Sequence, residues 1–194
     1  MKDKIFKVFE ESIEIKKKFV KENVDTVLEV AKVIAKAFND GKKLILFGNG
    51  GSATDASHIA AEFVNRYKKE RPSLPAIALN TDMAVITSIA NDYDFSEVFA
   101  KQLKSLSNEG DVVIAISTSG SSPNVLKAMD VAKKKRLITV AFTGLKGEKL
   151  VSKANYAFIV PSDNTPRIQE THIILGHVIC RVVEEILFEA PRGK

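Results

Sequence analysis

The sequence has only one cysteine, no long apolar run and no long block of like charge, and each absence narrows what the protein can be. Cys180 alone cannot form an intramolecular disulfide, and its apolar neighbours predict a buried structural thiol rather than a nucleophile. No stretch approaches the roughly 18 consecutive apolar residues of a membrane span. Residues 1–7 mix charges where a signal peptide would be apolar. We therefore expect a cytoplasmic protein without a membrane partner.

The net charge of +5 comes from lysines that are interspersed with acidic residues. Only two short basic runs break this mixture, at residues 16–18 and 133–136. A nucleic-acid-binding surface needs a concentrated basic patch, whereas short runs are typical of solvated helix faces. Nucleic acid is therefore not an expected partner.

Glycine and proline are sparse and fall mainly between the predicted elements. Residues 3–40 contain neither, and apolar side chains recur there at helical spacing. We predict two helices within residues 1–40, with apolar faces left over for oligomerisation. No repeat, low-complexity tract or long linker divides the rest of the chain. Its length and 45% hydrophobic content suit a single domain over residues 1–194.

Beyond residue 40, short apolar runs rich in Ile, Val, Leu and Phe alternate with helical patterns. Continuous apolar strands are typical of a parallel sheet that is covered on both faces, so the predicted fold class is α/β with a five-stranded parallel sheet. The predicted strands cover residues 43–48, 76–80, 112–117, 137–143 and 156–160. The predicted helices cover residues 52–67, 84–90, 95–106, 123–134 and 167–188.

Two polar loops follow the first and third predicted strands, Gly48-Asn-Gly-Gly-Ser52 and Ser117-Thr-Ser-Gly-Ser-Ser122. Ligands of open parallel sheets bind at the carboxyl ends of the strands near a switch point, which places both loops in one crevice. Backbone N–H groups and hydroxyls at a helix start can surround a phosphate without a lysine. An ordinary turn with a capping serine is the alternative, but five hydroxyl residues in six positions exceed what one cap requires. We therefore predict a phosphate site.

His58 and Glu62 lie four positions apart on the helix after the first loop, so an imidazole and a carboxylate share one face. This spacing suits acid/base or metal chemistry, although both could be ordinary helix residues. The last helix adds Gln169 and His177 in an otherwise apolar segment, about 80° apart around the axis at ~100° per residue. Burial would keep the His177 imidazole neutral and available as a base or ligand, whereas a hydrogen-bonded core histidine is the common alternative. His172 points away from His177 and is the poorer candidate.

Asn91 and Asp92 interrupt two helical patterns. Residues of these types can cap the helix that follows, or they can bind sugar hydroxyls. The local pattern does not separate the two roles.

Five stretches occur in order along the chain: Phe47-Gly-Asn-Gly-Gly-Ser-Ala, Asp55-Ala-Ser-His-Ile-Ala-Ala-Glu62, Ala90-Asn-Asp92, Ala115-Ile-Ser-Thr-Ser-Gly120 and Arg167-Ile-Gln-Glu-Thr-His-Ile-Ile-Leu-Gly-His177. In this combination, which covers nearly the whole chain, the sequence resembles the phosphoheptose isomerases, a family of sugar isomerase (SIS) domain proteins. The serine-rich loop alone is shared across SIS domains. The resemblance implies a flavodoxin-like sheet, a homotetramer, and conversion of sedoheptulose 7-phosphate into D-glycero-D-manno-heptose 7-phosphate for lipopolysaccharide or surface-layer glycan precursors.

The resemblance also implies roles for particular residues. Glu62 and His177 would be the catalytic pair. His58, Glu62, Gln169 and His177 match family positions that bind zinc, for which imidazole and carboxylate are common ligands and glutamine a less usual one. The positions implied for the phosphate are Ser52, Ser117, Thr118, Ser119 and Ser122. The positions implied for the sugar are Asn49, Gly50, Gly51, Glu62, Asn91, Asp92 and Gln169.

Interconversion of a ketose and an aldose moves a proton between C1 and C2 through an enediol. We assign Glu62 as the base and His177 as its acid/base partner, in roles that could be exchanged. A related SIS protein that associates with the bacterial replication initiator also resembles this chain, and it is a non-catalytic adaptor. That relative lacks the acidic residue at the position of Glu62 and the histidine at that of His177, so the sequence favours catalysis. An isomerase of another sugar phosphate is the third interpretation.

Overall fold

A five-stranded, fully parallel sheet forms the centre of the molecule in the computed structural model, which describes residues 1–189. The strand order is β2-β1-β3-β4-β5, the flavodoxin-like order, and the predicted fold class is confirmed. Every residue of the two central strands β1 and β3 is buried, as their continuous apolar sequences require. The strands are β1 Leu44–Gly48, β2 Ala76–Ala78, β3 Val112–Ile116, β4 Ile138–Gly144 and β5 Tyr156–Val160.

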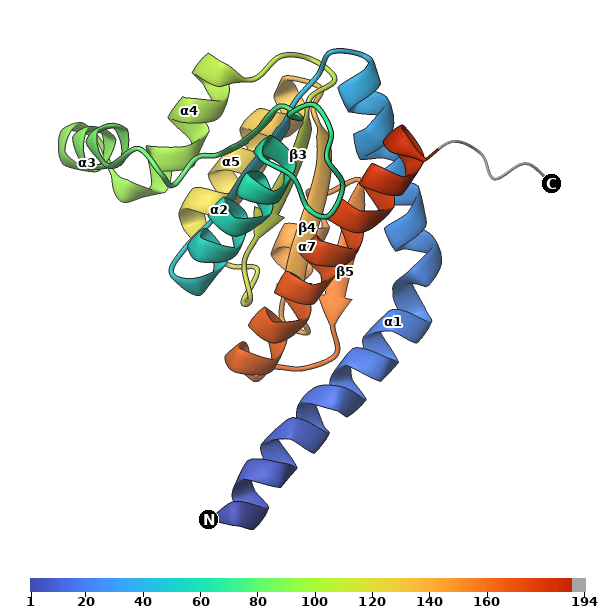
Figure 1. Cartoon of the computed structure of the whole chain (residues 1–194). Helices are drawn as coiled ribbons and strands as arrows, with labels where there is room; N and C mark the ends of the chain where they lie inside the picture. Colours follow the sequence, from blue (N-terminus) through green and yellow to red (C-terminus); the bar gives the residue numbers. More distant parts are fainter. Residues whose placement is uncertain (190–194) are drawn as a thin grey trace.

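Helices cover both faces of the sheet (Figure 1). One face packs on α1, α2 and α7 through a cluster that includes Leu44 and Leu46, and the other packs on α4 and α5 through a cluster that includes Ile45 and Phe47. This alternation along β1 follows from the period of two in a strand. The helices are α1 Lys2–Asn39, α2 Gly51–Val64, α3 Met83–Asp92, α4 Val98–Leu106, α5 Pro123–Lys134, α6 Glu148–Val151 and α7 Thr165–Phe188, with a short 3₁₀ turn, η1, at Phe95–Glu97.

Helix α1 is one continuous helix, and the prediction of two helices in this segment is wrong. Neither glycine nor proline occurs between its ends, so nothing interrupts its backbone hydrogen bonds. Most of its buried residues lie in the second half, which packs against the body, while its amino-terminal end projects from the body (Figure 1). No helix within residues 1–189 combines the length and the apolar character needed to cross a membrane. The exposed apolar side chains of α1 are Ile5, Phe6, Val8, Phe9, Ile13, Val20, Val24 and Leu28.

Several predicted boundaries move in the structure. Helix α2 ends at Val64 rather than at residue 67, because the chain after it turns toward α7. Asn91 and Asp92 form the last turn of α3, and the side chain of Asp94 caps η1 by accepting from the Ser96 amide at 2.8 Å. The role of Asn91 and Asp92 as caps of the following helix is therefore not observed. Helix α6 was not predicted, because four residues are too few to show a helical period.

His172 lies in the core and away from His177, as its helical position predicted. Its Nε2–H donates to the carbonyl oxygen of Thr143 at 3.3 Å, while its Nδ1 has no partner within the described residues. Burial lowers the pKa of the His172 imidazole from 6.5 to about 4, and the bond to Thr143 only partly opposes this shift. The residue is a structural part of the core.

We expect His172 by itself to lower the free energy of unfolding as the pH falls from neutrality toward 4, while Asp55, whose carboxyl pKa burial raises to about 6, acts in the opposite direction. The unfolded chain takes up a proton at His172 near pH 6.5, whereas the folded chain does so only near pH 4, so acid favours the unfolded state. The pKa difference corresponds to at most roughly 3 kcal/mol. Urea unfolding of the unchanged protein and of His172→Gln at a series of pH values measures this contribution as the difference between the two slopes, because Asp55 acts equally in both. An unchanged slope in the variant would assign it to other groups.

Candidate active site

The loops that follow β1 and β3 lie side by side at the carboxyl ends of the two central strands. Asn49 and Asn124 join them through two reciprocal amide hydrogen bonds of 2.9 Å. Gly48 lies at the same junction, where an added Cβ would stand 2.8 Å from the carbonyl oxygen of Ile116 and from Ser52. The predicted neighbourhood of the two loops is confirmed, because β1 and β3 are adjacent strands and α2 and α5 begin at this edge.

The serine-rich loop does more than start a helix. Ser122 occupies the cap position of α5 but makes no capping hydrogen bond, and its Oγ instead lies 3.2 Å from Oγ of Ser117. Ser119 accepts hydrogen bonds from Ser121, and Gly120 takes the positive φ of 60° that the tight turn requires. Helix α2 likewise begins without a side-chain cap, after Gly50. Two helix starts whose N-cap residues make no side-chain cap thus lie at one strand edge, and the positive ends of two helix dipoles there suit an anion.

A second polar group lies further along α2, where it faces α7. Nε2 of His58 is 3.2 Å from Oε1 of Glu62 and 3.4 Å from Nε2 of His177. The two imidazole rings meet edge to face, with centroids 4.9 Å apart. His177 is half-buried rather than buried, because it faces α2 at the surface and not the core. The sequence-based expectation of a buried His177 is therefore wrong, while its pairing with the α2 residues is observed.

Gly176 brings α2 and α7 close enough for this contact. A Cβ at this position would lie 2.4 Å from Cδ1 of Ile59, so a larger residue would require the buried Ile59 side chain or one of the helices to shift. Glycine in a helix interior costs about 1 kcal/mol relative to alanine, and its presence beside His177 was a sequence signal that a close helix contact occurs here.

His58, Glu62 and His177 form a donor set that fits a zinc ion. Their ligand atoms all lie within 4.8 Å of one another, and the three residues range from half-buried to exposed. Two imidazoles and one carboxylate are the ligands of many catalytic zinc sites, which keep a fourth position open for water or substrate. The cluster could equally serve proton transfer, since it joins a carboxylate and two imidazoles.

Gln169 lies elsewhere on α7. A Cβ built on Gly51 would meet its Nε2 at 2.4 Å, so its side chain rests against the start of α2. Eight residues of helix separate it from His177, a rise of roughly 12 Å. Within one chain the structure therefore places Gln169 beside the loop that follows β1 and not in the imidazole cluster.

Asn91 and Asp92 also lie apart from the cluster. Both are exposed, and Nδ2 of Asn91 donates to Asp92 at 3.0 Å. Helix α3 has no buried residue within it, and Figure 1 shows it at the opposite edge of the molecule from α7. Within residues 1–189 no hydrogen bond joins either of them to His58, Glu62 or His177.

Three residues near the site were not singled out from the sequence. Asn124 has no local signal, because its partner Asn49 is 75 positions away. Tyr67 contacts His177, which is far away in the sequence, so no local pattern indicates the contact. Asp55 shares a helix with His58, and burial raises the pKa of its carboxyl to about 6, an effect that His58 partly opposes. By contrast, Cys180 is buried, and burial together with the nearby Glu62 and Glu184 raises the pKa of its thiol, as expected of a structural cysteine.

Residues 8–144 match the family model described as a SIS domain. Over 194 residues, all of this chain and 96% of the relative, the sequence is 66% identical to a phosphoheptose isomerase of Thermodesulfovibrio yellowstonii. The chain belongs to the phosphoheptose isomerase family.

Two further comparisons agree with this membership. The chain is 51% identical to a phosphoheptose isomerase of Aquifex aeolicus over 189 residues, which are 97% of this chain and 99% of the relative. Its structure is similar to that of a phosphoheptose isomerase from Francisella tularensis, with a TM-score of 0.91 and 38% identity over 94% of this chain and 97% of the other. Phosphoheptose isomerases are aldose–ketose isomerases of the SIS fold, so the family resemblance seen in the sequence is confirmed and the adaptor interpretation is not favoured.

Proposed function

We propose that Glu62 and His177 catalyse the isomerisation of sedoheptulose 7-phosphate to D-glycero-D-manno-heptose 7-phosphate in this member of the family. The observation that carries the proposal is the meeting of a carboxylate on α2 with imidazoles on both α2 and α7, within 4.8 Å. A single acid or base would not suffice, because the reaction moves protons both on carbon and on oxygen. The serine-rich loop, at the amino-terminal end of α5, would supply donors for the phosphate.

The chemistry requires one proton transfer between carbons and one between oxygens. Glu62 takes a proton from C1 of the ketose and returns it to C2 of the enediol. His177 receives the proton of the C1 hydroxyl and supplies one to the C2 oxygen, so that no proton is gained or lost overall. His58 holds the Glu62 carboxylate in place through their 3.2 Å contact. These roles rest on side-chain geometry, and the order of base and acid could be reversed.

His58, Glu62 and His177 would hold a zinc ion in the proposed site. When bound, the ion would polarise the substrate oxygens and stabilise the negative charge of an enediolate. Gln169, which matches the fourth ligand of the family, lies against Gly51 in its own chain. We therefore propose that it contacts substrate there, and that any ligation by Gln169 comes from a neighbouring subunit.

The two parts of the site are far apart along α2, because the ten residues from Ser52 to Glu62 rise roughly 15 Å. An elongated sugar phosphate could span them, or the parts of two subunits could combine. The proposed homotetramer would provide the second arrangement, with Asn91 and Asp92 arriving from a neighbour. We also propose that the protein acts in the cytoplasm and that its product supplies lipopolysaccharide precursors.

NMR of the purified protein incubated with sedoheptulose 7-phosphate tests the proposed function. We expect resonances of the aldoheptose 7-phosphate to appear, and none in a control without protein. Incubations with and without added zinc show whether the ion is needed. No conversion in either condition would reject the proposal, and conversion of a five- or six-carbon ketose phosphate instead would favour an isomerase of another sugar.

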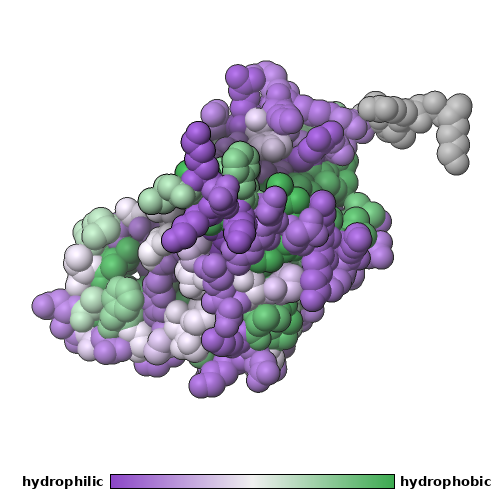
Figure 2. Space-filling model, turned by 90° about the horizontal axis from the view of Figure 1, so that it is seen from below, coloured by the Kyte–Doolittle hydropathy of each residue, from purple (hydrophilic) through white to green (hydrophobic). Residues whose placement is uncertain are grey.

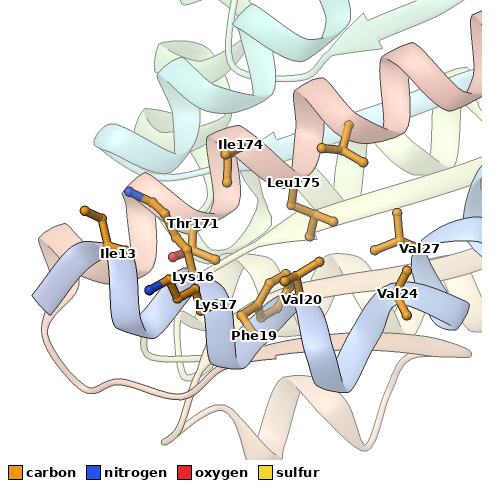
Figure 3. Close-up of a pocket in the computed structure, with 11 residues that line it drawn as sticks. Ile13, Lys16, Lys17, Phe19, Val20, Val24, Val27, Thr171, Ile174 and Leu175 are labelled. Atoms are coloured by element: carbon orange, nitrogen blue, oxygen red, sulfur yellow. The ribbon is translucent and has the colours of Figure 1, made fainter. Parts of the chain in front are cut away.

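We expect the protein to be a tetramer, with a mass by light scattering of about four times its 21.3 kDa. Its surface carries exposed apolar patches among polar ones when viewed from below (Figure 2). A groove of about 410 Å³ between α1 and α7 is lined mainly by apolar side chains, among them Val20, Val24 and Ile174 (Figure 3). Burial of such faces between copies is the usual reason for their exposure.

Val20→Lys combined with Val24→Lys should reduce the mass, because two charges would be buried in the contact. Val20 and Val24 are each about half exposed in the single chain, so the change should leave its fold intact. Lys21→Gln on the same helix is the matched control. A monomer at micromolar concentration in the unchanged protein would reject the predicted assembly.

A further inference from the structure

The segment that follows α2 is fastened to α7 by one buried carboxylate. Glu184 is 2% exposed, and its two oxygens accept hydrogen bonds from the backbone amides of Tyr67, Lys68 and Lys69 at 2.9, 3.1 and 3.2 Å. Burial alone would raise the pKa of the Glu184 carboxyl, but these bonds and that from Arg71 outweigh burial and lower it. Glu184 is therefore held as a carboxylate at the centre of the turn.

Arg71 completes this arrangement. Its Nε donates to Glu184 at 2.9 Å, and both side chains of the pair are almost fully buried, at 1% and 2% exposed. Its remaining nitrogens donate to carbonyl oxygens at the end of α2, including those of Glu62 and Phe63, both at 2.8 Å. We call Arg71 and Glu184 the clamp. The clamp joins the end of the helix that carries Glu62 to the helix that carries His177.

The clamp also fixes where the ring of Tyr67 lies. The backbone amide of Tyr67 is bonded to Glu184, seven residues after His177 and so on the same face of α7. The Tyr67 ring stacks against the His177 imidazole, with centroids 5.7 Å apart and planes inclined by 27°. His58 meets the same imidazole edge to face. The His177 imidazole thus contacts two rings: that of Tyr67 and that of His58, which belongs to the proposed catalytic cluster.

We propose that Tyr67 is a positioning residue, whose ring, anchored by the clamp, holds the His177 imidazole toward His58 and Glu62. The role depends on the ring and not on the hydroxyl, for which the structure gives no hydrogen bond within the described residues. Without the ring, His177 would have free rotamers on a half-exposed helix face. The proposal rests on the proposed function in one respect, that His177 acts on the sugar.

Two variants at Tyr67 separate ring packing from other effects. Tyr67→Leu removes the ring but keeps the backbone amide that Glu184 binds, so the clamp and the fold should persist. We expect kcat to fall by about 10- to 100-fold, because a catalytic group displaced by about 1 Å can cost that much. The KM should change by no more than about twofold, because the phosphate loops are untouched. Tyr67→Phe keeps the ring and should restore a kcat close to that of the unchanged protein.

A second measurement does not depend on turnover. In metal-free protein with ¹³C-labelled histidine, the ring protons of His177 should show a shift from the Tyr67 ring in the unchanged protein and in Tyr67→Phe. The shift should be lost in Tyr67→Leu, while the resonances of buried His172 stay in place and report an intact fold. The resonances of His177 are assigned with a His177→Asn variant.

The outcomes distinguish the two proposals. An unchanged protein that converts no sedoheptulose 7-phosphate would reject the proposed function, while the shift of the His177 ring protons would still decide whether Tyr67 positions it. If the unchanged protein is active, full kcat in Tyr67→Leu would overturn the inference. A Tyr67→Phe variant as slow as Tyr67→Leu would overturn it as well, since the hydroxyl would then be what matters. A rise in KM with unchanged kcat would assign Tyr67 to substrate binding instead.

Discussion

Replacing Glu62 by glutamine is expected to lower kcat about a thousandfold, within the range for a positioned acid or base. The amide matches the carboxylate in size, and its oxygen can still accept the contact of His58 that now spans 3.2 Å. What is lost is the ability to take a proton from carbon. The rate of aldoheptose formation, followed by NMR or by a coupled assay, measures the effect.

Substrate binding should survive this change. The phosphate loops lie roughly ten residues of helix away, so protection of the variant against thermal unfolding by sedoheptulose 7-phosphate should match that of the unchanged protein. Glu70→Gln is the matched control, because the Glu70 side chain is 88% exposed and forms an ion pair with Arg66 at 3.4 Å. Turnover of Glu62→Gln at the rate of the control would reject Glu62 as the base.

The change Gly48→Ala is expected to destabilise the protein by about 3 kcal/mol, the upper part of the range for overpacking. The new Cβ would stand 2.8 Å from the carbonyl oxygen of Ile116 and from the backbone and side chain of Ser52. Backbone atoms of a central strand cannot yield as a flexible side chain does. The loops after β1 and β3 must therefore separate, which would also disturb the bonds between Asn49 and Asn124.

Urea unfolding of Gly48→Ala measures the loss of stability, and thermal protection by inorganic phosphate measures the effect on the loops. Gly41→Ala is the control, because Gly41 has a positive φ of 69° but open space around its Cβ position, far from the site. That control should cost only about 1 kcal/mol and leave phosphate protection intact. Equal effects of the two substitutions would contradict the close contact at Gly48.

The parts of the fold that were predicted correctly depend on short-range pattern. The central strands can be recognised as continuous apolar runs because both of their faces are covered. Strand β5 also has the predicted bounds. The pairing of His58 with Glu62 follows from helical spacing alone. The serine-rich loop was identified because its hydroxyl content exceeds the needs of a cap. Each of these features can be recognised within a few consecutive residues.

The remaining features depend on contacts between distant segments. The exposure of His177 depends on how closely α2 approaches α7, and the sequence indicates this approach only through Gly176. The clamp joins residues 113 positions apart, and no local pattern marks either Arg71 or Glu184 as buried. The single helix α1 was divided in error, although the absence of glycine and proline argued for continuity. The predicted role of Asn91 at the sugar stays a prediction, because the single chain shows no bond between Asn91 and the cluster and the proposed tetramer is untested.

In the proposed tetramer, folding of the projecting amino-terminal end of α1 would depend on protein concentration. Residues 2–11, its first ten, are all exposed in the single chain, so they gain little tertiary packing to offset the conformational entropy lost in forming a helix. In the proposed tetramer, burial against another copy would supply that packing. The melting temperature would then rise with protein concentration, and dilution would fray α1 from its amino end before the sheet unfolds.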